Sequence, residues 1–371
     1  MSMRAYRVIQ WGTGNTGSHA LRFLLEDPLF DVVGVWVGRE QNVGRSAGEL
    51  AGLEPIAPSA GPAATHDVDA LVALDADCVV YMAAEPQRSP SKPGTDGWQS
   101  IGVICRLLAS GKNVVSTGIS GLINPTTYGP EVYERLRTAA DAGGSTFFGT
   151  GIEPGFMCDA LALALTSVSR DIRSVRTQEV ISYATYDQPN YHVSRGGIWG
   201  AACDGDFARS FARVLVAAGM GAPVRLLADA LHVGLDDVTA AVEFAPAEHS
   251  FAVPMGTIAQ GTIAGYRFEI LGTVRGEPVI AVEHVTRLDP AIAPTWPRVD
   301  PGGFRVLIDG TPSYRVEVAF DEDDPNIAGC TGTAARAVNA IPIVCGAPAG
   351  VCSFLDLPMI SAAGSVGGRR R

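Results

Sequence analysis

The sequence lacks the cysteine patterns that mark disulfide-stapled or zinc-binding proteins. Its seven cysteines are an odd number at wide spacing, and no C-x-x-C pair occurs among them. A disulfide framework is therefore not expected, and this cysteine usage fits a reducing cytoplasm. No pair of histidines or cysteines has the spacing of metal ligands, so we expect no metal site.

The sequence also lacks an excess of basic residues and a long hydrophobic run. Its 28 lysines and arginines are outnumbered by 39 acidic residues, which gives a formal net charge of −11. Nonspecific nucleic-acid binding needs a basic face, so we expect no nucleic-acid partner. Only six residues precede the first apolar run, and no stretch approaches the ~20 apolar residues of a membrane span. We therefore expect neither a signal peptide nor a membrane partner.

What the sequence does have is an ordinary globular composition. Its 371 residues are 47% apolar and 18% charged, so the chain can bury a sizeable core and is long enough for two domains. We expect a dinucleotide-binding domain over 1–155 and a second domain over 156–329. A C-terminal helix and tail over 330–371 are expected to pack back on the first domain.

Strand-like and helix-like segments alternate through the first 155 residues. Near-continuous apolar runs, such as 30–37 and 76–82, are typical of strands buried on both faces of a parallel sheet. Segments between them, such as 97–111, have apolar residues at helical spacing. This alternation predicts a doubly wound α/β sheet of the Rossmann type with right-handed crossovers.

The pattern changes after Gly155. A long strand is expected over 174–186, and helices are expected over 203–221 and 223–244. Strand-like segments then follow one another directly, with turn residues between them, which predicts an α+β domain with a mostly antiparallel sheet. These successive strands are expected at 261–276, 277–288, 302–310 and 312–320.

Three glycines in the order G-x-G-x-x-G stand between the first apolar run and a helix-like segment. In that context Gly12 permits a tight turn, Gly14 lets a pyrophosphate approach the backbone, and Gly17 lets helix and strand pack closely. The N-terminus of the helix would offer amide groups to the anion. The alternative is an ordinary strand–helix turn. We expect the dinucleotide to be bound by Gly12, Thr13, Gly14, Asn15, Thr16 and Gly17.

The end of the second strand bears on which dinucleotide is bound. An acid that holds the ribose hydroxyls usually stands there, but here Gly38 is followed by Arg39 and Glu40. A guanidinium pairs well with a 2′-phosphate, so the sequence favours NADP, with Arg39 as the candidate and Arg45 as a second. Glu40 could instead hold a ribose, which leaves NAD open, and Arg39 could be an ordinary surface residue.

Seven segments, in their order along the chain, resemble a bacterial family. They are VIQWGTGNTGSHALRFLLEDP, VVGVWVGREQNVGRSAGELAGL, DCVVYMA, GKNVVST, GTGIEPGF, VIAVEHVTRLDPAIAPTWP and AVNAIPIVCGAPAGVCSFLDLP. The family is dihydrodipicolinate-reductase-like and includes 2,4-diaminopentanoate dehydrogenase and the native amine dehydrogenases. The resemblance spans nearly the whole chain. It implies a nicotinamide-dependent oxidoreductase, commonly a homodimer, that converts a ketone and ammonia into an amine or the reverse.

The chain departs from this family in two places. It has no histidine-rich motif with a lysine, by which true dihydrodipicolinate reductases hold their substrate, so that reaction is not expected. The loop 118–125 has no carboxylate, although amine dehydrogenases of the group tend to have a glutamate there. Ser120 stands at about that position, and we expect it in the substrate pocket.

Amine chemistry needs a group that holds ammonia and moves protons, and a carboxylate suits both tasks. Ligands of open α/β sheets lie beyond the carboxyl ends of the strands. Glu153 follows such a strand and could replace the missing loop acid, since Asn or Ser is more usual there in the family. Glu85 opens the loop 84–97, a candidate lid. The alternative for Glu153 is a surface glutamate that fixes a turn, and the alternative for Glu85 is a solvated loop charge. At two further strand ends, Ala83 and Thr117 are expected to line the cofactor site.

An aromatic stretch over 181–200 follows the long strand and is typical of the wall of a substrate pocket. We expect Tyr183 in this pocket. His192 is a candidate acid or base, with simple surface exposure as the alternative. His284 alternates with apolar residues in a strand, and the family resemblance implies that it points toward the active cleft. The alternative for His284 is a structural histidine of the sheet.

Three functions are open at this point, and the first is the prediction. The chain could be an NAD(P)H-dependent amine dehydrogenase, a ketone or aldehyde reductase of the same fold, or an NADP-binding protein without turnover. The expected ligands are NADP, with NAD as the alternative, a small ketone or amine, and ammonia. A homodimer is expected because the open face of the second sheet needs to be covered.

Overall fold

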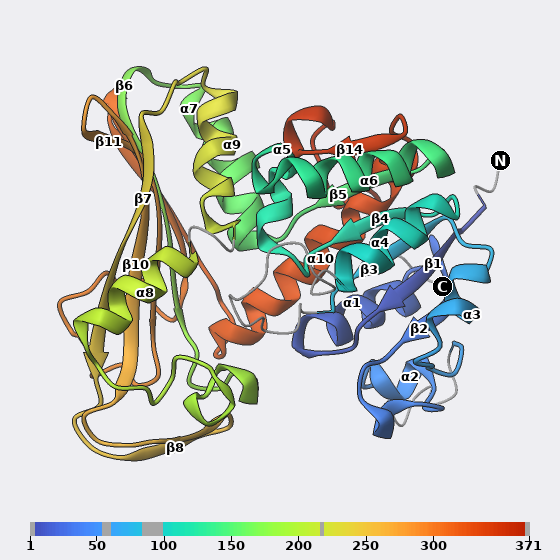
Figure 1. Cartoon of the computed structure of the whole chain (residues 1–371), viewed down its shortest axis with the longest axis horizontal. Coiled ribbons are helices and arrows are strands. Elements are labelled where there is room, and N and C mark those ends of the chain that lie inside the picture. Colours follow the sequence, from blue (N-terminus) through green and yellow to red (C-terminus); the bar gives the residue numbers. More distant parts are fainter. Residues whose placement is uncertain (1–3, 54–60, 84–98, 216–218, 368–371) are drawn as a thin grey trace. The chain divides into compact units, whose positions relative to one another are not determined.

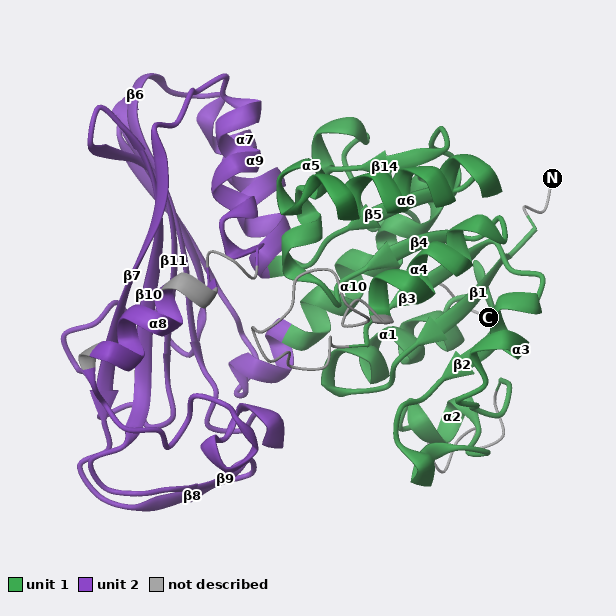
Figure 2. Cartoon of the chain, in the orientation of Figure 1, with its two compact units in different colours: residues 1–152, 330–371 green, residues 153–329 purple. Residues whose placement is uncertain are grey.

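The computed structural model describes residues 4–53, 61–83, 99–215 and 219–367. The chain divides into two compact units, which Figure 2 distinguishes by colour. Unit 1 contains residues 1–152 and 330–371, and unit 2 contains residues 153–329. The boundary predicted after residue 155 lies slightly downstream of this division.

Unit 1 is built on a parallel sheet of six strands, as the alternating pattern predicts. The strand order is β14-β5-β4-β3-β1-β2. The strands are β1 (Tyr6–Trp11), β2 (Phe30–Trp36), β3 (Cys78–Tyr81), β4 (Asn113–Ser116), β5 (Thr146–Gly149) and β14 (Gly350–Cys352). The chain runs from β1 to β2 on one side and then to β3 on the other side of β1. In open α/β sheets such a switch point is where ligands bind.

Helices cover both faces of this sheet (Figure 1). Alternate residues of β1 serve two cores, because Val8 packs with residues of α1 and α10, whereas Ile9 and Trp11 pack with residues of α4 and α6. Burial on both faces explains why the strands are almost continuously apolar. The helices are α1 (Asn15–Glu26), α2 (Ala47–Leu50), α3 (Val68–Ala73), α4 (Gln99–Ala109), α5 (Pro125–Tyr128), α6 (Pro130–Gly143) and α10 (Pro325–Cys345), with the 3₁₀ turns η1 (Glu40–Asn42), η2 (Ser120–Ile123) and η7 (Phe354–Asp356).

Unit 2 contains a second sheet of six strands in the order β13-β12-β6-β11-β10-β7. The pairing of β6 with β11 is parallel and the other four pairings are antiparallel, as predicted for the second domain. The strands are β6 (Arg170–Ser182), β7 (Asp237–Pro246), β10 (Ile263–Val274), β11 (Glu277–Arg287), β12 (Gly303–Thr311) and β13 (Tyr314–Ala319). A separate hairpin is formed by β8 (Phe251–Val253) and β9 (Gly256–Ile258).

Two helices of unit 2 pack against one broad face of this sheet. Phe211 of α8 contacts the ring of Tyr266 on β10, and Val224 of α9 lies against Gly272 of the same strand. Residues of even number on β10 and β11 therefore face the helices, because side chains alternate between the two faces of a strand. The remaining elements are η3 (Ile152–Leu161), α7 (Ala162–Thr166), η4 (Pro189–Tyr191), η5 (Val193–Arg195), α8 (Gly205–Leu215) and α9 (Ala222–Ala230).

The helix predicted over 223–244 is wrong in its second half. The helix α9 ends at Ala230, and Asp237–Pro246 form β7, which pairs with β10. Good helix formers, including Ala240 and Glu243, obscure the strand in the sequence. The strand nevertheless alternates between more and less exposed residues, which is the two-residue period of a half-buried strand.

The helix α10 confirms the predicted C-terminal helix but corrects the expectation that no segment is long and apolar enough to span a membrane. It has 21 residues, and an 18-residue window of it reaches a mean hydropathy of 1.2. Its residues Ala337, Ile341 and Val344 are fully buried and belong to the core that includes α1. We therefore interpret α10 as a core helix of unit 1.

The face of the second sheet that points away from α8 and α9 carries a network of charges. Its centre is Glu283, whose side chain is fully buried. Glu283 accepts hydrogen bonds from Arg176 Nη1 at 2.9 Å, Arg267 Nε at 2.6 Å and Gln178 Nε2 at 2.5 Å. Glu269 forms ion pairs with the same two arginines. The charges thus compensate one another across β6, β10 and β11.

Neutralising Glu283 is expected to destabilise the fold strongly. In Glu283→Gln two partly buried guanidinium groups lose a fully buried counter-charge, which typically costs about 3–5 kcal/mol of the free energy of unfolding. The matched control is Glu317→Gln, because the Glu317 side chain is 42% exposed in its pair with Arg305 and its loss should cost less than about 1 kcal/mol. Urea denaturation measures both values, and equal losses would contradict the role assigned to burial.

Candidate active site

The predicted glycine turn joins β1 to α1 and needs glycine for measurable reasons. Gly12 has φ = +97°, and a Cβ on it would lie 2.9 Å from the backbone nitrogen of Ala83. A Cβ on Gly17 would lie 2.1 Å from the carbonyl oxygen of Gly12. The turn therefore requires glycine at Gly12 for its backbone angle and at Gly17 for close packing of helix and turn, as the sequence predicts.

Gly14 differs from the other two glycines because it faces open space. A Cβ on Gly14 would meet no described atom within 4 Å, and Gly14 is exposed at the N-cap of α1. No side chain of the described residues caps this helix end, and no acidic residue lies in its first turn. Thr13, Asn15 and Thr16 lie in the same turn. An uncapped helix N-terminus beside a bare backbone fits the diphosphate of a dinucleotide.

A buried glutamine supports the turn, and sequence reasoning missed it. Gln10 on β1 is fully buried, and its Nε2 donates a hydrogen bond to the carbonyl oxygen of Gly12 at 2.8 Å. This bond satisfies a turn carbonyl that faces the protein interior. A glutamine within an otherwise apolar strand, two residues before the first glycine, was the available signal.

The predicted strand-end residues of the cofactor site lie together at the switch point of the sheet. Ala83, which follows β3, approaches Gly12, which follows β1. Thr117, which follows β4, donates its backbone amide to the carbonyl oxygen of Tyr81 at 3.0 Å. A Cβ on the adjacent Gly118 would lie 2.4 Å from the carbonyl oxygen of Ala83. The structure thus brings Gly12, Ala83 and Thr117 to the carboxyl ends of neighbouring strands.

The loop after β2 presents a guanidinium group that has no partner in the part of the chain that the structure describes. Arg39 is exposed, and its side chain makes no hydrogen bond or ion pair with the described residues. Glu40 is also exposed and lies 3.5 Å from His66 Nδ1. The alternative cation, Arg45, donates to Asn42 Oδ1 at 3.3 Å. Of the two arginines, Arg39 is the one available to a phosphate.

A second group of candidate functional side chains lies on the helix-facing side of the sheet in unit 2. His284 Nδ1 donates a hydrogen bond to Glu179 Oε2 at 2.8 Å and lies 3.8 Å from Glu153 Oε2. Strand register produces the first contact, because His284 on β11 is directly opposite Glu179 on β6. Phe268 on β10 stands opposite His284, and Phe304 on β12 stands opposite Glu179. The ion pair therefore lies in a row between two apolar rings.

Glu153 joins this row from a different part of the chain. It lies near the start of η3, at residues 153–155, whose backbone angles are not helical. Its side chain is only 4% exposed. The predicted candidate acid is thus buried beside His284, so the alternative of a surface glutamate is wrong.

Aromatic rings enclose His284. The rings of Phe268 and Tyr266 stack near it at centroid distances of 5.2 and 5.6 Å, and Tyr183 meets it edge-on at 5.7 Å. Trp199 extends this wall, 5.0 Å from the ring of Tyr266. The stretch 181–200 therefore contributes to an aromatic wall around His284, whereas the pocket role of Tyr183 stays a prediction.

Four buried polar atoms in this region have no hydrogen-bond partner among the described residues. They are Glu153 Oε1, His284 Nε2, Trp199 Nε1 and Thr286 Oγ1. The ring of Tyr266 contacts the rings of His284 and Trp199, and Thr286 stands opposite Tyr266 in the register of β11. Buried polar atoms are nearly always hydrogen-bonded, so these four mark a place where a polar ligand or water binds.

Burial and neighbouring charges together raise the pKa values of Glu153 and His284. Burial raises the pKa of the Glu153 carboxyl to about 7, with the His284 hydrogen bond opposing the shift and the Glu179 charge adding to it. Burial alone would lower the pKa of His284, but the Glu179 charge and the two carboxylate contacts outweigh it and raise the pKa to about 10. At neutral pH His284 is therefore an imidazolium, and Glu153 exchanges its proton readily.

The remaining predicted site residues are His192, Ser120 and Glu85. His192 is held by its surroundings, with Nδ1 2.8 Å from Ser194 Oγ and Nε2 3.0 Å from the carbonyl oxygen of Thr257. Its catalytic role stays a prediction that these contacts do not support. Ser120 begins η2 in unit 1, and its pocket role also stays a prediction. Glu85 and the loop 84–97 lie outside the described residues.

The acid–histidine group also has the dimensions of a small metal site. Ligand atoms of Glu153, Glu179 and His284 lie within 4.8 Å of one another. The direct hydrogen bond between Glu179 and His284, however, uses the ligand atoms to satisfy one another. The expectation that no metal is bound therefore stays a prediction.

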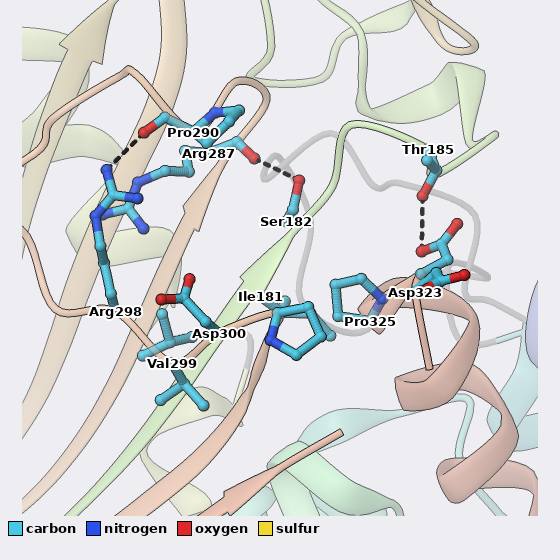
Figure 3. A pocket seen from close by; sticks show the side chains of 13 residues that line it. Ile181, Ser182, Thr185, Arg287, Pro290, Arg298, Val299, Asp300, Asp323 and Pro325 are labelled. Atoms are coloured by element: carbon cyan, nitrogen blue, oxygen red, sulfur yellow. Dashed lines mark hydrogen bonds between the residues drawn. The ribbon is translucent and has the colours of Figure 1, made fainter. Parts of the chain in front are cut away.

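Unit 2 has in addition a cavity of about 290 Å³, shown in Figure 3. It is lined by the end of β6, by Arg287 at the end of β11, and by residues of the segments that follow β6, β11 and β13, and several of its polar groups are paired. Ser182 Oγ donates to the carbonyl oxygen of Arg287 at 3.3 Å, Thr185 Oγ1 donates to Asp324 Oδ1 at 3.0 Å, and Arg298 Nη2 donates to the carbonyl oxygen of Pro290 at 2.6 Å (Figure 3). Within the described part of unit 2, the buried polar atoms without a hydrogen-bond partner belong instead to Glu153, Trp199, His284 and Thr286, which makes the surroundings of His284 the candidate site.

Comparison with known proteins identifies relatives over the whole chain. The family model of the 2,4-diaminopentanoate dehydrogenase C-terminal domain matches residues 156–367. An amine dehydrogenase of Streptomyces virginiae is 33% identical over 369 residues, which cover 97% of this chain and 98% of the relative. A 2,4-diaminopentanoate dehydrogenase of Acetoanaerobium sticklandii is 24% identical over 360 residues, covering 96% and 94%.

A solved structure has the same fold. The amine dehydrogenase from Mycobacterium smegmatis matches with a TM-score of 0.74 at 19% identity, covering 96% of this chain and 97% of that chain. At this level of identity the match supports the architecture of the two units. The fold class predicted from the sequence is confirmed.

Alanine at Gly14 is expected to weaken dinucleotide binding without unfolding the protein. The new Cβ enters the open space beside the end of α1, where a diphosphate would approach the backbone, and displaces no described atom. Isothermal calorimetry with NADPH and NADH should show at least a tenfold loss of affinity, while thermal unfolding of the free protein stays unchanged.

The matched control is Gly102→Ala in α4, where a Cβ also meets no described atom within 4 Å. This variant should bind the dinucleotide normally and gain about 0.5–1 kcal/mol of stability, because alanine is favoured over glycine inside helices. Normal dinucleotide affinity in Gly14→Ala would refute the site.

Proposed function

The chain belongs to the family of 2,4-diaminopentanoate dehydrogenases and amine dehydrogenases, and we propose on this basis that it is a nicotinamide-dependent amine dehydrogenase. The reaction is the reductive amination of a small ketone with ammonia, or the oxidative deamination of the corresponding amine. The observation that carries the proposal is a buried carboxyl, Glu153, whose Oε1 has no partner among the described residues and whose pKa is about 7.

Glu153 has the properties that amine chemistry asks of a proton carrier. A general base works best when its pKa lies near the working pH, and the carboxylate form can also hold an ammonium ion. An acid buried among aromatic rings would ordinarily stay protonated, but the imidazolium of His284 keeps the ionised form accessible. This geometry supports the prediction that Glu153 takes over the task of the loop acid that the sequence lacks near Ser120.

The cofactor would be held by residues of unit 1 and would supply the hydride. Gly12, Gly14 and Gly17 fit its diphosphate, as shown above. The finer proposal is that NADP is preferred, because Arg39, whose guanidinium has no partner among the described residues, follows β2, where a 2′-phosphate is recognised in folds of this type. Glu40 is exposed in the same loop and keeps NAD binding open.

The proposal includes a homodimer in the cytoplasm. A second copy would cover the sheet face that carries Glu283, where the side chains of Arg176 and Arg267 stay partly exposed. All seven cysteines are free, which suits a reducing compartment. The burial of α10 in the core of unit 1 supports a protein that acts without a membrane.

A second candidate is a ketone or aldehyde reductase of the same fold. The lack of a carboxylate in the loop that begins with Gly118 favours it, because that loop has an acid in typical amine dehydrogenases. The buried Glu153 argues for the amine reaction, since reduction of a free ketone does not require a group that binds ammonia.

Ammonia dependence decides between these functions. Purified protein is given a panel of small ketones with NADPH or NADH, with and without ammonium, and oxidation of the cofactor is followed by absorbance. We expect oxidation that requires ammonium and is faster with NADPH. Oxidation without ammonium would identify a ketone reductase, whereas cofactor binding without turnover of any ketone or amine would identify a binding protein.

The variant Glu153→Gln tests the proton carrier. It should lower kcat/KM for amine oxidation by about 10²–10⁴-fold, the usual contribution of general acid–base catalysis. In the unmodified protein, kcat/KM should fall below a pH of about 7, because the protonated carboxyl no longer accepts a proton. The variant should lose this acid limb.

A folding defect is distinguished by the melting temperature. Burial opposes ionisation of Glu153, so a neutral glutamine should leave the melting temperature at pH 8 unchanged or raise it. An active Glu153→Gln variant that keeps the acid limb would exclude Glu153 as the proton carrier.

A further inference from the structure

The imidazole of His284 has one ring nitrogen in use and one unused. Nδ1 donates to Glu179, but Nε2 is buried and has no acceptor among the described residues. The residue is 4% exposed, and Phe268 and Tyr266 stack on the ring. A buried donor without an acceptor lowers the stability of the fold, so the unpaired Nε2 of His284 is a cost to the folded protein.

The protonation state of His284 determines which kind of atom can form a hydrogen bond with its Nε2. An imidazolium has two N–H donors and no acceptor, so its partner must be an acceptor. Glu179 compensates the positive charge, and therefore the partner need not be an anion. The carbonyl oxygen of a ketone is a neutral acceptor that matches these requirements.

We propose that His284 is a second catalytic residue, which donates from Nε2 to the carbonyl oxygen of the ketone and supplies a proton when that oxygen leaves as water. This inference rests on the proposed amine dehydrogenase function. Glu179 is the positioning residue, since its hydrogen bond fixes the ring and its charge holds the proton on it. Glu153 serves the nitrogen of the reaction and His284 serves the oxygen.

The protons balance when the two residues act together. Ammonia forms a bond to the carbonyl carbon, and the C=O electron pair moves to oxygen. The proton lost by nitrogen passes through the Glu153 carboxylate to the oxygen. His284 Nε2 then gives the second proton as the C–O bond breaks, which leaves an iminium ion, water and a neutral imidazole. Solvent then returns one proton to the imidazole. The balance is correct, because forming an iminium ion and water from a ketone and ammonia consumes one proton.

Two isosteric variants separate the ring nitrogens. In His284→Asn the side-chain amide keeps a donor near the position of Nδ1, toward Glu179, and removes Nε2. In His284→Gln the longer side chain places a donor near the position of Nε2. We expect His284→Asn to lower kcat for ketone amination by about 10²-fold or more and His284→Gln to retain part of it. Both should bind the dinucleotide with unchanged affinity.

A cyclic imine tests the assignment to oxygen, because its reduction breaks no C–O bond. A five-membered cyclic imine is reduced in parallel with ketone amination, and the ratio of the two rates is compared between the proteins. The ratio of amination to imine reduction should fall at least 100-fold in His284→Asn. An unchanged ratio overturns the proposal, even where both rates fall, because the variant then has a general defect.

If the unmodified protein does not reduce the cyclic imine, a hydrogen isotope effect decides. The isotope effect is the ratio of the amination rates with unlabelled and with deuterated cofactor. It should fall to 1 in His284→Asn, because cleavage of the C–O bond precedes hydride transfer and becomes rate-limiting in this variant. An isotope effect above 1 overturns the proposal. Failure of the unmodified protein to aminate any ketone is a different outcome, because it removes the proposed function itself.

Glu179→Gln adds a pH readout that a purely structural role would not produce. The titratable groups that face His284 are Glu179 on β6, Glu153 on η3, Tyr266 on β10 and Tyr183 after β6. Removing the Glu179 charge removes the main support for the raised pKa of His284, while burial continues to lower it. Ketone amination in this variant should decline as pH rises through the range 6–9, whereas imine reduction should not. A flat profile for both reactions would contradict the proton role.

Discussion

The ion pair between His284 and Glu179 is the interaction on which the chemistry proposed for unit 2 depends. It lies between Phe268 and Phe304 in one row across four strands, where water cannot screen it. A charge pair in such a place is stable when both partners are satisfied and costly when one is removed. The same pair sets the proton affinity of Glu153, which without a neighbouring cation would stay protonated throughout the neutral range. Strand pairing thus determines the acid–base behaviour of a residue that belongs to none of these strands.

The sequence was most informative where local geometry requires one residue type. The glycines at Gly12 and Gly17 are needed for a backbone angle and for close approach, so their spacing predicted both the turn and the parallel sheet around it. Glu153 could be nominated because it follows a strand end, where ligands of such sheets bind. The helix expected over 223–244 failed because alanine and glutamate favour helix locally, whereas pairing with β10 makes the second half a strand.

The rest of the candidate site depends on register, which a single sequence does not contain. Glu179 lies 105 residues before its partner His284, and only the parallel alignment of β6 with β11 brings them together. Glu179 in TQEVIS and His284 in VEHVTR are polar side chains within strands that are otherwise rich in apolar residues. These polar interruptions were the available signal. The signal is ambiguous because Glu283, next to His284, is also charged and buried but points to the opposite face. Its partners there are two arginines and a glutamine, and they leave it no role in proton transfer.

The missing loop acid and the buried Glu153 are best understood together. A carboxyl group moved into an apolar site gains proton affinity, and alone it would be a poor base at neutral pH. The imidazolium beside it opposes that gain, and the pKa of about 7 is the result of the two effects. A buried carboxyl in place of the loop acid therefore needs a cation beside it, which is His284. That cation in turn needs a counter-charge, which Glu179 provides. The pKa values of Glu153 and His284 therefore depend on each other and on the charge of Glu179. The cation also brings a second donor, His284 Nε2, whose position follows from the ring orientation that Glu179 imposes. In the proposed reaction, the group that supplies the carboxylate thereby also supplies a proton donor for the oxygen of the same substrate.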